Sequence, residues 1–315
     1  MTPGAAIAVE HLVRRFGHFV AVDDISFDVR RGEVFGFLGA NGAGKSTTIR
    51  MLCGLLRPTS GRAAVDGIDV GRDPEGVKRR IGYMSQRFSL YELLSVDQNI
   101  RFYGGLYGLS GPRLEARRRF ALDMAGLAGR EKELTRHLSG GWRQRLALGC
   151  ALLHEPPIVF LDEPTGGVDP VSRREFWRLI DTLSGEGTTV LVTTHYLDEA
   201  ERCDRVAILH AGTLAALGTI AQLKATFADR PILEVRSPDP VAAMTMLDGL
   251  PFVEKTSLFG TAVHAVLRDR QFTPDHIRAA LSGAGIPATS VQPVVASLED
   301  VFLDVADRMA RSRAA

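Results

Sequence analysis

Residues 39–46 of the chain read Gly39-Ala40-Asn41-Gly42-Ala43-Gly44-Lys45-Ser46. This stretch fits the pattern G-x-x-x-x-G-K-[ST] at every fixed position. Its glycines let the backbone curl so that successive N–H groups point at phosphate oxygens, and the helix that follows adds the positive end of its dipole. We therefore expect residues 39–47, Thr47 included, to bind ATP. Lys45 should reach the β- and γ-phosphates, and Ser46 should coordinate Mg²⁺.

A second signal is a pair of acids that follows a short apolar strand. Residues 158–161 are four consecutive apolar residues, and Asp162 and Glu163 come directly after them. Open α/β sheets bind ligands at the carboxyl ends of their strands. We expect Asp162 to hold Mg²⁺ through water and Glu163 to orient or deprotonate the attacking water. The phosphate loop alone leaves kinases, GTPases and ATPases open, and the two acids narrow the choice towards an ATPase.

The pattern around these motifs predicts an α/β protein with a P-loop NTPase core. Strand-like residues 158–161 and 188–193, separated by a helical segment, indicate a parallel sheet covered on both faces. Residues 7–13 and 21–30 alternate apolar and polar side chains, which favours an antiparallel N-terminal β-subdomain. Residues from about 88 to 154 have a mainly helical pattern. We interpret them as a helical insertion in the core.

A domain boundary is expected near Asp229. Beyond it, the segments follow the order strand, helix, strand, strand, helix, strand, and a last helix covers 298–309. That order fits a small α+β ferredoxin-like domain. The sequence therefore predicts a nucleotide-binding domain over 1–229 and an accessory domain over 230–315. The accessory domain could brace a dimer, regulate the cycle or be a passive appendage.

Composition excludes several classes of protein. The formal net charge is +1, so no overall field attracts nucleic acid or a membrane surface, and we expect no direct nucleic-acid partner. The three cysteines form no CxxC pair, which favours buried thiols in a reducing compartment over disulfides or a zinc site. We see no signal peptide and no apolar run near the roughly 18 residues that cross a bilayer. Any action at a membrane would need another chain to span it.

A third motif points to one family of ATPases. Residues 138–145 read Leu138-Ser139-Gly140-Gly141-Trp142-Arg143-Gln144-Arg145. Taken alone, this segment could be a well-capped helix start. A serine and two glycines that open a helix also make a second anion site. Here the chain resembles the ATP-binding cassette (ABC) ATPases, which are defined by a Leu-Ser-Gly-Gly signature, and the resemblance spans roughly residues 5 to 220.

The resemblance implies further site residues. Phe16 is similar to the aromatic that stacks on adenine, with Phe19 as the alternative. Gln86 is similar to the glutamine that touches Mg²⁺ and the attacking water. Asp169 resembles the aspartate of the loop that connects two copies, and His195 resembles the switch histidine that contacts the γ-phosphate.

The resemblance also implies a homodimer in which two cassettes stack head to tail. Ser139, Gly140 and Gly141 of one copy would complete the site that Lys45 and Glu163 form in the other. The chain departs from many members of the family at Trp142 and at Gly166-Gly167. Both departures could alter coupling between the copies.

Within the family, the signature variant and the tail motif, residues 297–302, look like cassettes of the drug- and antibiotic-exporter branch. There the ATPase is a separate chain that pairs with an integral membrane permease, so we expect a peripheral protein at the cytoplasmic face of the cell membrane. A group of aromatics lies in the region that receives the permease in this family: Phe88, Tyr91, Phe102, Tyr103 and Tyr107. The alternatives are an importer cassette, a soluble ATPase acting on nucleic acid or ribosomes, and a regulatory module that binds ATP without steady turnover.

Overall fold

The computed structural model describes residues 4–86 and 90–314, and the chain divides into two compact units, Met1–Thr219 and Ile220–Ala315. The division therefore falls earlier in the chain than the boundary that we expect near Asp229. Helix α8 (Ile220–Lys224) packs against the last helix, α11 (Leu298–Ala314), which explains why it belongs to the second unit.

A six-stranded sheet forms the centre of the first unit. Its strand order is β10-β9-β3-β8-β7-β6, and all neighbouring strands are parallel except β10, which is antiparallel to β9. The strands are β3 (Val34–Leu38), β6 (Ile81–Met84), β7 (Ile158–Asp162), β8 (Thr189–Thr194), β9 (Arg205–His210) and β10 (Thr213–Gly218). Every residue of β3, β7 and β8 is buried, as expected for a parallel sheet covered on both faces. The predicted parallel core is confirmed.

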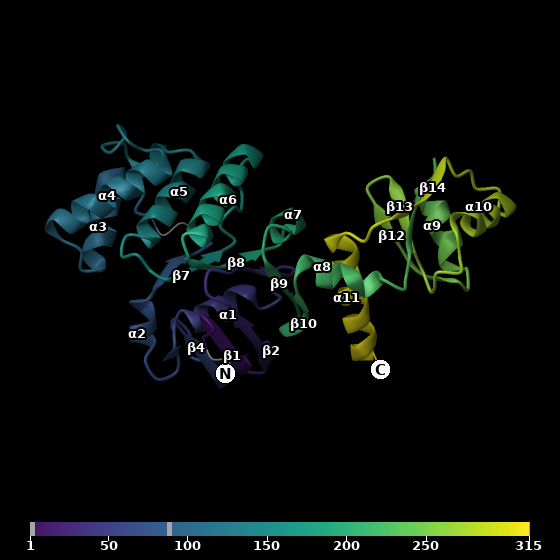
Figure 1. Ribbon diagram of the computed structural model, residues 1–315, viewed down its shortest axis with the longest axis horizontal. Coiled ribbons are helices and arrows are strands. Elements are labelled where there is room, and N and C mark those ends of the chain that lie inside the picture. Colours follow the sequence, from purple (N-terminus) through teal and green to yellow (C-terminus); the bar gives the residue numbers. More distant parts are fainter. Residues whose placement is uncertain (1–3, 87–89, 315) are drawn as a thin grey trace. The chain divides into compact units, whose positions relative to one another are not determined.

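Helices and a second sheet cover the central sheet. In Figure 1, α5 (Gly140–Ala151) and α6 (Pro170–Gly185) lie on one side of it, and α1 (Lys45–Leu52) lies on the other. An antiparallel sheet of β1 (Ile7–Phe16), β2 (Phe19–Val29), β4 (Ser60–Val65) and β5 (Ile68–Asp69) shares a core with α1. This is the antiparallel N-terminal subdomain that the sequence predicts. Two short helices, α2 (Pro74–Lys78) and α7 (Leu197–Ala200), complete this part.

The helical insertion has a core of its own. It contains α3 (Val96–Leu106), α4 (Gly111–Ala125), a 3₁₀ turn (Thr135–His137) and α5. Val96, Leu122 and Leu146 are among its buried apolar residues. Asn99 is fully buried and donates to Thr135 Oγ1 at 2.9 Å, so the start of α3 is held to the segment that leads into α5.

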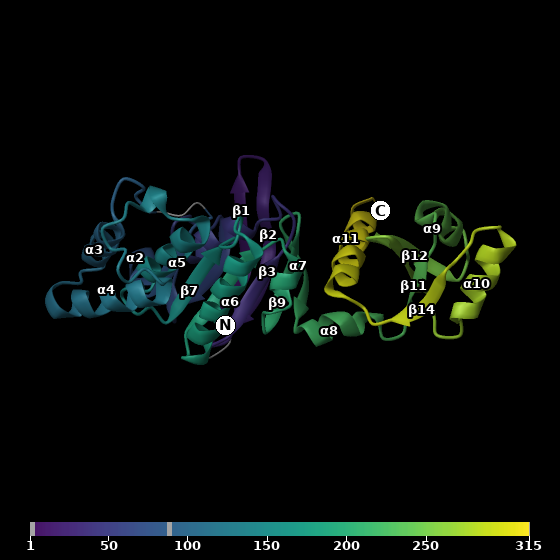
Figure 2. The same cartoon turned by 90° about the horizontal axis from the view of Figure 1, so that it is seen from above.

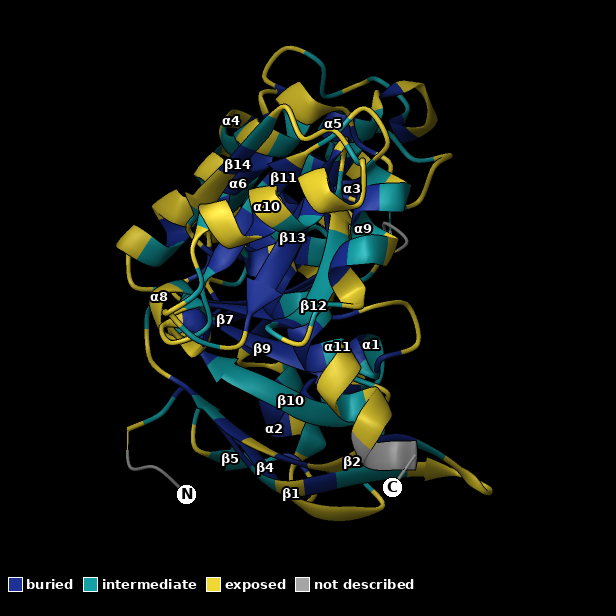
Figure 3. Ribbon diagram, turned by 90° about the vertical axis from the view of Figure 1, so that its right-hand side faces the viewer, coloured by how far each residue is buried: buried dark blue, intermediate teal, exposed yellow. Residues whose placement is uncertain are grey.

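The second unit has the strand order β12-β13-β11-β14, and all its strand pairs are antiparallel. Its elements follow the predicted order: β11 (Ile232–Arg236), α9 (Pro240–Asp248), β12 (Val253–Phe259), β13 (Ala262–Leu267), α10 (Pro274–Gly283) and β14 (Ser290–Val294), with a 3₁₀ turn (Ala225–Phe227) after α8. That order and topology confirm a ferredoxin-like fold. In Figure 2, the sheet lies between α11 and the pair α9 and α10. The central strand β13 is buried along its whole length (Figure 3).

Charged side chains attach α11 to the sheet. Asp304 on α11 is 2% exposed and accepts from Arg230 and Lys255, each within 3.0 Å, and Asp300 pairs with His264 Nδ1 at 2.8 Å. Burial acts to raise the pKa of Asp304, but Arg230 and Lys255 outweigh it and lower the pKa to about 2 from an ordinary 3.8. The stabilisation from Asp304 is therefore complete above about pH 4 and is lost as the pH falls towards 2.

We expect Asp304→Asn to loosen α11. The amide leaves Arg230 and Lys255 with a weaker partner, at a cost of about 1–3 kcal/mol in local stability. Backbone amides of α11 should then exchange faster with deuterium in the full chain at neutral pH. The wild type should also lose α11 protection between pH 4 and 3 more steeply than the variant does. Asp307→Asn is the matched control, since Asp307 is half exposed and contacts only Lys255 among the ion pairs described. Equal exchange in the wild type and Asp304→Asn would contradict this assignment.

Candidate active site

The phosphate loop joins β3 to α1 and requires glycine at two of its positions. Gly44 has φ 103°, and a Cβ there would lie 2.7 Å from Ala21 O. A Cβ at Gly39 would lie 2.6 Å from Leu209 O. The loop is thus packed closely against neighbouring backbone. No side chain caps the first turn of α1, so its N–H groups suit an anionic ligand.

Lys45 lies over this loop. It is 4% exposed, and its Nζ donates to Gly39 O at 2.7 Å and to Ala40 O at 3.2 Å. The same ammonium is 3.2 Å from Glu163 Oε1. The fixed lysine of the loop and the second acid after β7 therefore meet in one place, as the sequence predicts.

The serine of the loop meets the first acid. Ser46 Oγ donates to Asp162 Oδ1 at 2.9 Å, and Thr193 Oγ1 donates to the same oxygen at 2.8 Å. Asp162 is 1% exposed. A hydroxyl beside a carboxylate is an oxygen donor set of the kind that Mg²⁺ prefers, so these residues fit the expected metal.

Glu163 is the centre of a polar cluster. Gln86 Nε2 donates to its Oε2 at 3.1 Å, and His195 Nδ1 lies 3.4 Å from the same oxygen. Its backbone N–H donates to Thr193 Oγ1 at 2.8 Å. Glu163 also has φ 47°, a left-handed conformation that is uncommon for a residue with a side chain. Such strain is typical of functional sites, where the surrounding structure holds the residue in place.

A cavity of about 300 Å³ opens beside the loop. Its walls come from the hairpin between β1 and β2, from the phosphate loop and from the acid cluster: Phe19, Ala21, Asn41, Gly42, Ala43, Gly44, Lys45, Ser46, Thr47, Gln86 and Glu163. Phe16 is not among these residues. It is 46% exposed, and the Arg14 guanidinium lies 4.4 Å from its ring centroid. Phe16 and Phe19 pair across the same hairpin, so both aromatic candidates stand near the cavity.

The signature and the aspartate loop are placed elsewhere in the same unit. Ser139 caps α5 by accepting from Trp142 N, and Asp169 caps α6 by accepting from Val171 N and Ser172 N. Hydrogen bonds from Ser172 lower the pKa of Asp169. A Cβ on Gly141 would lie 2.4 Å from Ser172 Oγ, so the two helix starts pack together. Ser139, Gly140, Gly141 and Asp169 do not line the cavity that holds Lys45.

Two residues that sequence reasoning missed connect these parts. Thr193 binds both Asp162 and Glu163. Gln144 is fully buried in α5 and donates to Pro164 O at 2.6 Å, which ties the signature helix to the segment after Glu163. Thr193 lies near the end of a buried strand, at the sheet edge where ligands bind, so the sequence could have indicated it. Nothing in the sequence around Gln144 indicates that its partner is Pro164.

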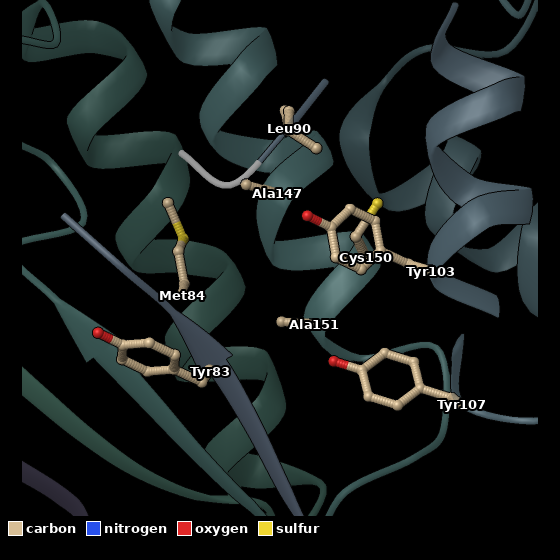
Figure 4. Close-up of a pocket in the computed structure, with 8 residues that line it drawn as sticks. All are labelled: Tyr83, Met84, Leu90, Tyr103, Tyr107, Ala147, Cys150 and Ala151. Atoms are coloured by element: carbon tan, nitrogen blue, oxygen red, sulfur yellow. The ribbon is translucent and has the colours of Figure 1, made fainter. Parts of the chain in front are cut away.

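The aromatics of the expected permease region divide into two groups. Tyr91 and Phe102 are 50% and 43% exposed, and their rings meet edge to face with centroids 4.8 Å apart. Tyr103 and Tyr107 pack against the core of the helical insertion and line a narrow pocket (Figure 4). Burial raises the pKa of both tyrosines to about 12. Phe88 lies outside the described residues.

Comparison with known proteins agrees with this geometry. Residues 22–166 match the family described as ABC transporter. The chain is 40% identical over 301 residues to the daunorubicin resistance ATP-binding protein DrrA3 of Streptomyces coeruleorubidus, covering 95% of each chain. It is 49% identical over 240 residues to the probable multidrug ABC transporter ATP-binding protein YbhF of Escherichia coli (strain K12), covering 76% of this chain but only 41% of that relative.

Solved structures give the same result. An ATP-binding subunit of an ABC transporter matches with a TM-score of 0.65 and 33% identity, over 71% of this chain and 93% of that one. The cassette MJ0796, in a dimeric post-hydrolysis state bound to ADP and Pi, matches with a TM-score of 0.62 and 26% identity, over 68% and 98%. No helix among the described residues is both long and apolar enough to cross a membrane.

Proposed function

Because this chain belongs to the ABC transporter family, among relatives named as multidrug and daunorubicin resistance ATP-binding proteins, we propose that it binds and hydrolyses ATP to drive a transporter. The observation that carries the proposal is that Lys45, Ser46 and Glu163 line one cavity, with Asp162 hydrogen-bonded to Ser46 beside it. We further propose that the transporter exports drugs, antibiotics or other hydrophobic compounds.

The chemistry follows from the contacts around Glu163. The loop amides and Lys45 would bind the phosphates of ATP, and Ser46, Asp162 and Gln86 would hold Mg²⁺. When bound, Mg²⁺ offsets the charge on the β- and γ-phosphate oxygens. Glu163 orients the attacking water and accepts its proton, while His195 contacts the γ-phosphate. The products are ADP and inorganic phosphate.

The proposed catalytic unit is a homodimer. The signature residues Ser139 to Gly141 do not line the cavity of their own chain, so they are available to a second copy. The similar cassette MJ0796 is described as dimeric, which supports the same arrangement here. The γ-phosphate would then bridge the two copies, with Asp169 close to the contact between them. ATP binding would join the copies, and hydrolysis would release them.

The proposed partner is an integral membrane permease on a separate chain, which holds this protein at the cytoplasmic face of the membrane. The exposed pair Tyr91 and Phe102 offers aromatic anchors of the kind enriched at protein interfaces. Affinity purification of the tagged chain from membranes tests this proposal. Recovery with one membrane protein supports a transporter, and recovery with ribosomes or DNA points to the soluble class. An importer and an exporter differ in the direction of transport through that permease.

Steady release of phosphate from ATP by the purified full chain tests the activity itself. We expect turnover that stops when Mg²⁺ is chelated. A chain that binds ATP but releases no phosphate would instead fit a regulatory ATP-binding module.

The base-stacking aromatic can be tested by substitution. We propose that Phe16 stacks on adenine, since one face of its ring is held by Arg14. Phe16→Ala should then weaken ATP binding by about 5- to 150-fold, the equivalent of 1–3 kcal/mol for one stacked base. Titration with a fluorescent ATP analogue measures the effect. Phe19→Ala is the matched variant, and a larger loss there would assign the role to the ring that lines the cavity.

A further inference from the structure

A buried carboxylate behind the acid cluster joins two segments of the site. Glu199, in α7, is 1% exposed. Its Oε1 accepts a hydrogen bond from Thr165 Oγ1, and its Oε2 accepts one from Thr194 Oγ1 at 2.7 Å. Arg173 of α6 supplies a cation, with its Nε 3.4 Å from Oε1. Three separate segments, the loop after β7, the end of β8 and α6, therefore converge on one side chain.

The burial of Glu199 has to be compensated by its neighbours. A buried carboxylate is costly unless hydrogen bonds and a counter-charge compensate it. Here both oxygens have hydroxyl donors, and the Arg173 guanidinium is itself stacked on Tyr196, 4.1 Å from the ring centroid. Thr165 and Thr194 are each 1% exposed, so water does not replace these bonds easily.

The two threonines stand next to the residues that carry out the proposed chemistry. Thr165 comes two residues after Glu163, in the turn that leads to Asp169, where Val168 N donates to Thr165 O at 3.3 Å. Thr194 directly precedes His195, which lies 3.4 Å from Glu163. Glu199 thus ties the segment of the acid to the segment of the histidine.

We propose that Glu199 is a positioning residue for ATP hydrolysis, acting through Thr165 and Thr194 to keep Glu163 and His195 in a fixed relation. The inference rests on the proposed ATPase function. Because Thr165 begins the turn to Asp169, the same carboxylate also fixes the loop that faces a second copy. Glu199 does not line the cavity beside the phosphate loop, so it acts on the rate and not on ATP binding.

Isosteric substitutions test this role. Thr165→Val and Thr194→Val remove one hydroxyl each and keep the volume of the side chain. Each should lower kcat by about 10- to 100-fold, the effect expected of a small misplacement of catalytic groups. The KM for ATP should change less than about twofold, because the substitutions remove no contact that binds ATP equally in the ground state and the transition state. Thr165→Ser and Thr194→Ser keep the hydroxyl and should restore most of the rate.

Thr189→Val is the matched control. Thr189 is equally buried, at the opposite end of β8, and its Oγ1 accepts from Gly32 N at 3.0 Å. Thr189→Val therefore loses one buried hydrogen bond, as Thr165→Val does, without contacting Glu199, and its kcat should equal that of the wild type. Thr194→Val also removes the acceptor of Tyr196 N, which lies 2.9 Å from Thr194 Oγ1. A drop in kcat like that of Thr194→Val would mean that general loss of packing explains both effects, which overturns the proposal.

The double variant Thr165→Val/Thr194→Val separates coupling from independent damage. If Glu199 joins the two segments, breaking either bond uncouples them, and the double variant should be about as slow as either single variant. Multiplied losses would overturn the proposal. If the wild type hydrolyses ATP and both single variants are as fast as the wild type, the proposed role of Glu199 is rejected and the ATPase function is kept. Absence of wild-type turnover would instead reject the proposed ATPase function.

Discussion

Replacing Glu163 with glutamine should lower kcat for ATP hydrolysis by about 100-fold or more, since positioned acid–base groups contribute 10²–10⁴-fold. Glutamine keeps the size of the side chain and an oxygen for Lys45, which lies 3.2 Å from Glu163 Oε1. It cannot accept the proton of the attacking water. ATP binding should persist, because the loop and Lys45 are unchanged. Phosphate release and equilibrium ATP titration measure the two effects separately.

The same variant should accumulate as a dimer with ATP. In the proposed cycle the γ-phosphate joins two copies, and hydrolysis is the step that separates them. Size-exclusion chromatography with and without ATP shows whether Glu163→Gln shifts to twice the mass. Glu186→Gln is a matched control, as Glu186 is an exposed acid at the end of α6. If Glu163→Gln bound ATP and stayed monomeric, the shared site would be wrong.

Those parts of the fold that depend on local pattern could be predicted from the sequence. The phosphate loop needs glycines at fixed places, and the structure shows why: Gly39 and Gly44 pack against neighbouring backbone. The positions of Asp162 and Glu163 could also be predicted. The apolar run before them indicates a buried strand, and ligands of an open α/β sheet bind at the carboxyl ends of its strands. The order of segments after residue 231 likewise predicted the ferredoxin-like unit.

Other features depend on contacts between distant residues, and the sequence alone did not reveal them. The unit boundary at Thr219 depends on α8 packing against α11, some eighty residues later in the chain. The left-handed conformation of Glu163 is imposed by its neighbours and has no glycine to signal it. Glu199 is one acid in an ordinary helical segment, and only the fold brings Thr165 to it.

Burial, which the sequence does not show, also determines which charged residues stabilise the fold. In the second unit, the sequence places Asp300 and Asp304 in the predicted last helix without marking them out, yet these two residues hold α11 on the sheet. The pair Phe16 and Phe19 shows the remaining limit. The two rings share one hairpin, and the pattern of the sequence cannot decide which ring faces the base.

Mixing two inactive variants should restore ATP hydrolysis if the site is shared between copies. Lys45→Met removes the lysine that we propose binds the phosphates, and Ser139→Glu places a negative charge where the signature would meet the γ-phosphate. Each variant alone should lose about 100-fold or more in kcat, as expected for removing a preorganised electrostatic contact. Both variants should remain folded. Ser139 caps the start of α5 and is exposed, so a glutamate there points into solvent and does not enter the core.

Recovery in the mixture follows from the geometry of a two-fold dimer. A heterodimer has one site with Lys45 from the Ser139→Glu copy and Ser139 from the Lys45→Met copy, and that site is intact. Random pairing at equal amounts makes half of the dimers mixed, so roughly a quarter of the wild-type rate should return. Neither variant alone should recover at twice the concentration. If Ser139 served the site of its own chain, every chain in the mixture would carry one defect in its own site, and no rate would return. The mixture therefore decides whether the loop at residues 39–47 is a complete ATP site or one half of it.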